Sequence, residues 1–269
     1  MKIFNFKRRK KPLFTTKILA ISNIVAFVAV IIVNYLATSL PIGGMTTGAL
    51  SDLYPNLFVP AGITFSIWGL IYLGLLGFVV WQIVDLFKKK SARITKKIGI
   101  WFLLSCVANI SWIFARHYRL VGLSVLIMLI FLAILIIISK KVEIGKKLGN
   151  LGDKYFVQVP FSLYLGWISV ATIANISTYL VNIGRSGRGI SPVSWTIIVI
   201  IVAMILALLA LYRKRDIVFA LVVIRAFLGI ILKRLGAEIV YTEIIWITGV
   251  AIMIISTYIG YSLEYWKKN

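Results

Sequence analysis

The chain has 269 residues, of which 61% are hydrophobic, and Lys and Arg outnumber Asp and Glu by 30 to 8. This composition excludes an ordinary soluble domain, because such domains are about half apolar. The apolar residues form long runs without apolar–polar alternation, a pattern typical of membrane helices and not of a β-barrel. The basic residues flank these runs, so the net charge of +22 favours membrane lipids as partners and not nucleic acid. The predicted fold class is an all-α integral membrane protein.

Eight stretches come close to the ~20 apolar residues that a membrane helix needs. They run over approximately 18–38, 61–84, 98–115, 120–139, 157–182, 194–212, 217–232 and 239–263. The seventh is short and carries Arg225. About eight transmembrane helices are therefore expected.

The basic residues also predict the orientation of these helices, because Lys and Arg concentrate in cytoplasmic loops. With the N-terminus inside, 23 of the 30 basic residues fall in inside segments and six in outside loops. This bias predicts a multi-pass protein of the cell membrane, with a basic cytoplasmic N-terminus (1–17) and a cytoplasmic C-terminus (264–269). The first run is long for a signal peptide and no small-x-small cleavage site follows it, so we expect it to be retained.

The longest outside connection, residues 39–62, contains three prolines, several glycines, no Lys or Arg, and one acid, Asp52. Loops of this length are often lids or binding loops. The alternative is a passive surface loop, and the sequence does not decide between them.

Polar side chains recur at helical spacing inside several runs, so that each set shares one side of its helix. The sets are Asn23 and Asn34 in the first run; Thr64 and Trp68 in the second; Trp101, Ser105, Ala108, Asn109, Trp112 and Arg116 in the third; and Tyr164, Trp167, Ala171, Asn175, Thr178 and Asn182 in the fifth. In the fourth run only Ser124 interrupts the apolar sequence. Since polar groups in hydrocarbon must find partners, we expect these faces to look inward and most of the fourth run to face lipid.

Two interpretations of the polar faces remain open. The Asn and Ser side chains can simply join helices, through hydrogen bonds worth about 0.6 kcal/mol each. Alternatively, large aromatic side chains with a few polar groups can form a pocket for a flat apolar ligand. The occurrence of Trp beside Asn on two separate helices favours the pocket.

Charged residues inside the runs are rare. Arg225 and Glu243 are expected at similar depth, about 10 Å below the outer surface, at about 1.5 Å per residue. We therefore expect a buried charge pair, either as a structural ion pair or as a site that couples transport to a proton or ion.

Conventional catalytic and metal-binding patterns are not found. Cys106 and His117 are the single cysteine and histidine, so neither a cysteine cluster nor a His-rich metal site is expected. No paired carboxylates share an inward face and no phosphate-binding glycine loop is present. Enzymatic activity stays undecided, with a binding protein favoured.

Three short motifs resemble the TspO/MBR family, the tryptophan-rich sensory proteins related to the mitochondrial translocator protein. FSIWGLIY (65–72) is similar to the second-helix signature of that family, ANISW (108–112) to its third-helix Asn-x-x-Trp, and WISVATIAN (167–175) to its fifth-helix pattern. They occur in family order, and the resemblance covers residues from about 18 to 182.

The resemblance implies a five-helix bundle over 18–185, with three additional helices over 194–263, and a ligand pocket closed by the first loop. Family members bind porphyrins and other flat hydrophobic ligands, some promote light-dependent porphyrin breakdown, and homodimers fit the family. With the residues of the polar faces, the predicted ligand-binding set is Trp68, Asn109, Trp112, Tyr164, Trp167, Ala171 and Asn175.

Three functions stay open at this point. The first is binding of a flat hydrophobic ligand of the tetrapyrrole class, in a sensory or transport-related role. The second is a small-molecule permease that uses all eight helices, with Arg225 and Glu243 in coupling. The third is an enzyme that acts on a lipid-soluble substrate.

Overall fold

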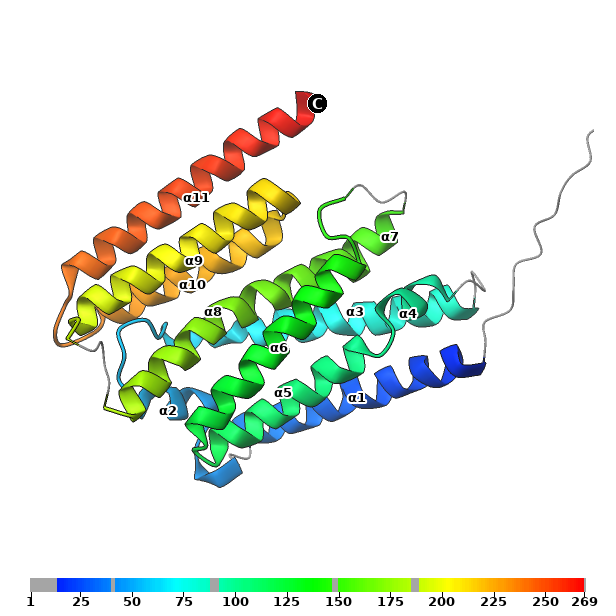
Figure 1. The fold of residues 1–269 in the computed structure, drawn as a ribbon, viewed down its shortest axis with the longest axis horizontal. Coiled ribbons are helices and arrows are strands. Elements are labelled where there is room, and N and C mark those ends of the chain that lie inside the picture. Colours follow the sequence, from blue (N-terminus) through cyan, green and yellow to red (C-terminus); the bar gives the residue numbers. More distant parts are fainter. Residues whose placement is uncertain (1–13, 40–41, 88–91, 147–149, 185–188, 269) are drawn as a thin grey trace, which may run out of the picture.

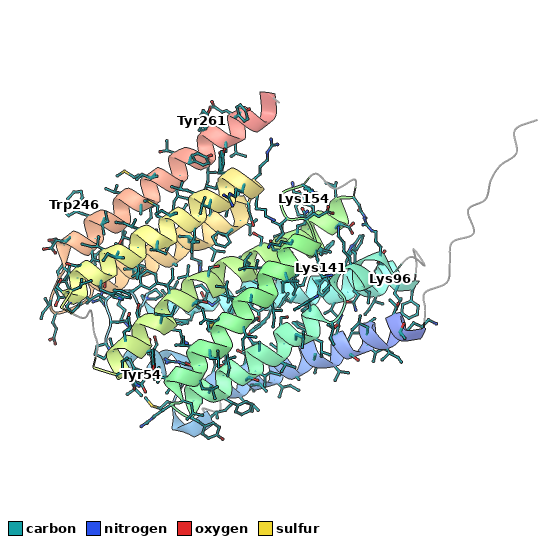
Figure 2. All side chains as sticks on the ribbon, viewed as in Figure 1. Tyr54, Lys96, Lys141, Lys154, Trp246 and Tyr261 are labelled. Atoms are coloured by element: carbon teal, nitrogen blue, oxygen red, sulfur yellow. The ribbon has the colours of Figure 1, made fainter. Side chains whose placement is uncertain are left out.

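The computed structural model describes residues 14–39, 42–87, 92–146, 150–184 and 189–268, and every regular element in these ranges is helical (Figure 1). Most of the predicted cytoplasmic segment 1–17, and the predicted outside residues Arg185 and Arg188, lie outside the described residues. The axes of the long helices are roughly parallel to one another, so the bundle has two ends. Tyr54 lies towards one of them, which we call the loop end. Lys96, Lys141 and Lys154 lie towards the other, the basic end (Figure 2).

Each of the eight apolar runs forms a long helix. The bounds are α1 (Phe14–Ser39), α3 (Ile67–Phe87), α5 (Trp101–His117), α6 (Val121–Lys141), α8 (Val159–Asn182), α9 (Pro192–Lys214), α10 (Ile217–Leu235) and α11 (Thr242–Lys268). Shorter elements connect them: η1 (Ile42–Gly44), α2 (Thr47–Asp52), η2 (Gly62–Ser66), α4 (Arg93–Ile98), α7 (Leu151–Asp153) and the π turn η3 (Lys154–Gln158).

Six of the described helices are long and apolar enough to cross a membrane. The other two long helices fall short by these measures: α5 has 17 residues, and α10 carries Arg225, Lys233 and Arg234 within 19. An all-helical membrane protein is therefore confirmed, whereas eight crossings stay a prediction.

Two of the expected boundaries are wrong. The third run was expected to begin at residue 98, but Ile98 ends α4 and Gly99 adopts φ 62, a left-handed backbone that stops the helix before α5. The fifth run was expected to begin at residue 157, but helical structure already begins at Leu151. The π turn ends two residues before Pro160, which has no N–H to continue the regular hydrogen-bond ladder.

The first five long helices pack into one bundle. Helix α6 lies between α5 and α8, α1 packs on α5 and α3, and α3 packs on α8. A ring cluster fills the centre, where Phe78 makes edge contacts with Phe102 at 4.9 Å and with Phe161 at 5.0 Å between ring centroids.

The three C-terminal helices pack on one another, and α10 joins them to α8 (Figure 1). Glycines allow this close approach. A Cβ on Gly166 of α8 would lie 3.0 Å from the Val222 side chain of α10, and a Cβ on Gly229 would lie 2.0 Å from Oγ1 of Thr64. The Ala61 amide also donates to the Gly229 carbonyl at 2.9 Å. The C-terminal helices therefore pack closely against the first five helices, with contacts that reach the backbone.

Asp216 fixes the turn between α9 and α10 against α8. Its carboxylate accepts hydrogen bonds from the Ser162 hydroxyl and, at 3.1 Å, from the Phe219 amide in the first turn of α10. Burial raises the pKa of Asp216, and the two hydrogen bonds oppose that shift.

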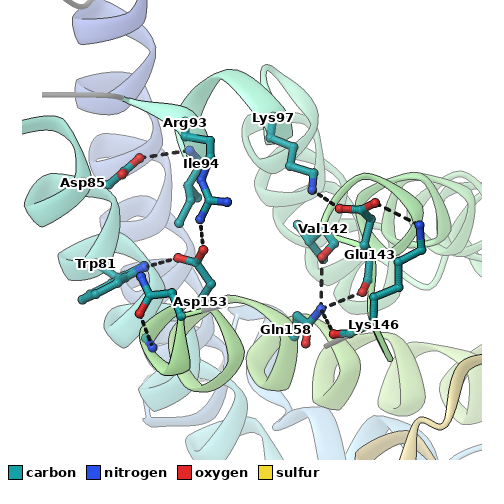
Figure 3. A network of polar contacts seen from close by, with 12 residues as sticks. Trp81, Asp85, Arg93, Ile94, Lys97, Val142, Glu143, Lys146, Asp153 and Gln158 are labelled. Carbon is teal, nitrogen blue, oxygen red and sulfur yellow. Dashed lines mark hydrogen bonds and ion pairs between the residues drawn. The ribbon is translucent and has the colours of Figure 1, made fainter. Parts of the chain in front are cut away.

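A polar network joins the connections at the basic end (Figure 3). Asp153 accepts from Nε1 of Trp81 at 2.9 Å and forms an ion pair with Arg93, which ties α3, α4 and α7 together.

The same network continues at the loop that follows α6. Glu143 pairs with Lys97 and Lys146, and Nε2 of Gln158 donates to the Glu143 carbonyl at 2.6 Å. The hydrogen bonds from Lys97 and Lys146, together with their positive charges, lower the pKa of Glu143 to about 2.

Candidate functional site

The polar faces of the sequence meet at a cavity beneath the first loop. Its volume is about 60 Å³. We call it the aromatic cavity. Its wall combines the first loop and η2 with α3, α5 and α8; it includes Phe65, Trp68, Trp112, Arg116, Trp167 and Asn175.

Aromatic side chains from η2, α3, α5 and α8 contribute to this wall. The Trp167 ring makes edge contacts with Phe65 and Trp68, with centroids 5.9 and 6.3 Å apart. Trp68 in turn stacks on Tyr72 and meets the edge of Tyr164. Such edge-to-face contacts are a favoured packing of aromatic pairs and hold these rings in place at the cavity.

A hydrogen-bond chain crosses three helices next to the aromatic cavity. The Asn34 amide of α1 donates to Oδ1 of Asn109 at 2.8 Å, and the Asn109 amide donates to the Tyr164 hydroxyl of α8 at 3.1 Å. Further along the same side of α8, the Asn175 amide donates to the Ser124 hydroxyl of α6 at 3.1 Å. The predicted inward orientation is therefore confirmed for these side chains, several of which join helices, whereas Asn182 at the end of α8 is exposed.

Other polar groups of the wall have no partner in the protein. Nε1 of Trp112, Nε1 of Trp167 and one terminal nitrogen of Arg116 are buried and form no hydrogen bond. Buried donors without a partner are uncommon in folded proteins and carry a free-energy cost of about 1–3 kcal/mol each. Three such donors around one cavity make this region suitable for a ligand with acceptor groups.

The structure brings together five of the seven predicted ligand-binding residues. The five on the wall are Trp68, Trp112, Trp167, Ala171 and Asn175. The other two, Asn109 and Tyr164, lie in the hydrogen-bond chain and not on the wall. A role of these residues in ligand binding stays a prediction.

The first loop covers the cavity and is attached at several points. Nδ1 of His117 lies 2.7 Å from the Ile42 carbonyl, and the Arg116 guanidinium lies 5.6 Å from the centroid of the Tyr54 ring. Asp52 forms an ion pair with Lys233 of α10. The loop is therefore a cover over the site, as the resemblance implied, and it also contacts the C-terminal helices.

The expected pair of Arg225 and Glu243 is not formed. Both side chains are exposed, and Arg225 donates to the Ser66 hydroxyl at 2.8 Å. The reason is the helix boundaries: α10 continues to Leu235 and α11 begins at Thr242. Arg225 therefore lies about 15 Å from the end of its helix and Glu243 about 1.5 Å from the start of its own.

Two arginines near the site are absent from the predicted ligand-binding set. Arg116 was placed on the inward face of the third run together with Trp112, and it lies on the wall of the aromatic cavity. Arg234 was counted as a loop charge, but it is 7% exposed and lines a second cavity under the loop. Among the described residues, no group of three His, Cys, Asp or Glu side chains could hold a metal ion.

Fold and site together define a multi-pass helical membrane protein with a loop-covered aromatic cavity between its helices. The family described as TSPO-like protein matches residues 20–261. The chain belongs to this TSPO-like family. The match continues through α9, α10 and α11, well beyond residue 182, where the motif resemblance ends. No curated protein and no solved structure matches the chain.

Proposed function

We propose that the protein binds a flat hydrophobic ligand of the tetrapyrrole class in the aromatic cavity, in a sensory or transport-related role. The observation that carries this proposal is the convergence of Trp68, Trp112 and Trp167 from three helices on one cavity, where two of the indole N–H groups have no partner. Membership of the TSPO-like family agrees with it.

The volume of the aromatic cavity requires a movement. A drug-sized ligand needs about 300–1,000 Å³, and the cavity holds about 60 Å³. Ser51 and Val59 of the first loop line this cavity and also the neighbouring one of about 400 Å³. Displacing this part of the loop would join the two spaces, so we propose that the loop moves when the ligand enters.

The proposal includes the membrane arrangement. We propose eight crossings of the cell membrane with both termini in the cytoplasm, supported by the surplus of Lys and Arg in the segments that this orientation places inside. Fusing a reporter that is active on only one side of the membrane to each connection would test every crossing, including α5 and α10.

The direct test is a titration of the purified protein in nanodiscs with protoporphyrin IX, followed by the porphyrin absorbance band. Trp167→Phe removes the unpartnered N–H and part of the ring surface, and Asn109→Ala removes the support of Tyr164. We expect each to weaken binding about tenfold, which corresponds to about 1.4 kcal/mol.

Trp246→Phe is the matched control, because Trp246 of α11 (Figure 2) is 75% exposed and does not line the aromatic cavity. It should bind porphyrin like the natural chain. Equal binding by all four proteins, or no saturable binding at all, would rule out the aromatic cavity as the porphyrin site.

A further inference from the structure

A second cavity lies between the first loop and the C-terminal helices. It has a volume of about 400 Å³ and is lined by parts of residues 51–59, the end of α8, the start of α9, the end of α10 and Tyr241. We call it the loop cavity. Its volume falls within the range of small-molecule sites.

Arg234 gives this cavity a positive charge that the protein does not neutralise. The side chain is 7% exposed and its Nε has no hydrogen-bond partner. Asp52, the acidic side chain on the same wall, is paired with Lys233. Within the part of the chain that the structure describes, Arg234 forms no ion pair.

A buried guanidinium without a counter-charge is energetically unfavourable, because burial removes its water and nothing replaces that interaction. Its planar arrangement of N–H groups matches the two oxygens of a carboxylate or phosphate. An anion at this position would therefore satisfy Arg234 better than the empty cavity does.

The rest of the wall is mostly apolar. Leu57 and Val59 come from the loop, Leu180 and Val181 from α8, and Trp195 from α9. The Trp195 indole is oriented by a hydrogen bond of 3.2 Å to the Ser177 hydroxyl. Apolar and aromatic walls around one charge without a partner, Arg234, beside the Asp52–Lys233 pair, suit a molecule with an apolar body and a single anionic group.

We propose that the loop cavity binds an amphipathic anion, with Arg234 as the residue that holds the carboxylate or phosphate. The anion is either a free organic acid or the headgroup of an acidic lipid, since the cavity lies at the loop end of the bundle. This site is formed with α9 and α10, outside the aromatic cavity, and does not depend on porphyrin binding.

The test compares two probes of nearly the same shape, 2-naphthoate and its neutral amide 2-naphthamide. Binding to the natural chain is measured by calorimetry in nanodiscs of phosphatidylcholine. We expect the carboxylate to bind at least tenfold more tightly than the amide. Equal affinities on the natural chain would overturn the proposal, and this comparison requires no variant.

Two variants assign the preference to its residue. Arg234→Gln should abolish the preference for the carboxylate, while Arg225→Gln, an arginine on the same helix that does not line this cavity, should keep it. A preference that persists in Arg234→Gln would overturn the proposal. Thermal unfolding of each variant confirms that it is folded.

A final arm identifies the source of the anion. Phosphatidylglycerol is added to the nanodiscs while 2-naphthoate binding to the natural chain is followed. If the acidic lipid weakens naphthoate binding in the natural chain, the headgroup occupies the Arg234 site. If naphthoate binds unchanged, the site prefers a free organic acid. Both results support the anion site, provided that Arg234→Gln removes the carboxylate preference.

Discussion

The two ends of the bundle differ in whether these polar side chains have hydrogen-bond partners. At the basic end, Asp153, Glu143 and Gln158 satisfy neighbouring amides and charges, and they fix the connections between helices (Figure 3). Beneath the first loop, donors of Trp112, Trp167, Arg116 and Arg234 have no partner and line two cavities.

This difference separates stability from function. Satisfied networks make a fold rigid, whereas unsatisfied buried groups cost free energy and persist where something else uses them. Substitutions at the basic end should therefore lower stability and leave ligand affinity of the folded protein unchanged. Substitutions under the first loop should lower ligand affinity and leave the stability of the fold unchanged.

The largest expected effect is that of Gly145→Ala at the basic end. Gly145 has φ +89, and a Cβ there would lie 1.5 Å from the Lys214 carbonyl oxygen. Backbone atoms on both sides cannot give way, so we expect a loss of about 3 kcal/mol or more, measured by thermal unfolding in detergent.

Gly189→Ala is the matched control for that change. Gly189 has nearly the same φ of +90 but no atom within 4 Å of an added Cβ. The backbone strain alone should cost about 1–2 kcal/mol. Equal losses in the two variants would show that close packing against Lys214 is unimportant.

Asp153→Ala should have the next largest effect. The substitution removes the acceptor of the Trp81 indole and the partner of Arg93. Hydrogen bonds to charged groups contribute about 1.5–3 kcal/mol, so we expect a loss of about 2 kcal/mol in the free energy of unfolding.

Asp153→Asn separates the two interactions, because the amide oxygen still accepts from Trp81 while the charge is lost. The free energy of unfolding of Asp153→Asn should lie between those of the natural chain and Asp153→Ala. Unchanged stability in both variants would contradict a structural role for the network. Reduced porphyrin affinity in folded Asp153→Asn would contradict the proposal that the basic end contributes to stability and not to ligand binding.

Asp216→Asn tests a buried acid where α10 begins. Burial raises its pKa, so the folded state holds the proton more tightly than the unfolded state. The stability that comes from the protonated acid is complete below the ordinary value of 3.8 and is lost as pH rises through the folded-state pKa.

The amide keeps acceptors for Ser162 and Phe219 but has no charge to bury. The free energy of unfolding of Asp216→Asn should therefore rise relative to that of the natural chain between pH 4 and pH 7.5. Unfolding temperatures at the two pH values measure this. A variant that loses stability towards neutral pH would show that the charged form is the one that the fold favours.

Much of the fold could be predicted because apolar runs and the spacing of polar residues are local properties. The inward faces carrying Asn109 and Asn175 followed from helix geometry alone, and five predicted residues meet at one cavity. The missed features are of another kind. The depth of Arg225 and Glu243 depended on helix ends that shifted by about three residues, which is enough to separate the pair.

The loop cavity could not be predicted for a different reason. It requires residues 51–59, the end of α8 and Arg234 to meet, although they are far apart in the sequence. The periodic pattern of a helix does not predict contacts between segments so far apart in the sequence. The glycines that permit it, Gly166 and Gly229, also have no local signature that distinguishes them from other helix glycines.

The smallest expected effect on stability, and the most specific for the loop, is that of Asp52→Asn. The Asp52–Lys233 pair joins the loop to α10, and the Asp52 side chain is 65% exposed. Such an exposed pair is worth about 0.5 kcal/mol, so the unfolding temperature should hardly change. If the pair must open before porphyrin enters, the association rate should rise about twofold, since 0.5 kcal/mol corresponds to that factor.

Salt gives an independent check on the natural chain. Raising the ionic strength screens an exposed pair, so it should speed porphyrin association in the natural chain and have little effect on Asp52→Asn. Stopped-flow absorbance in nanodiscs measures both rates. If neither the substitution nor salt changes the association rate, the pair does not control entry. The Arg116–Tyr54 contact would then be the attachment to test, because it lies between the two cavities and is shielded from salt by burial of the guanidinium.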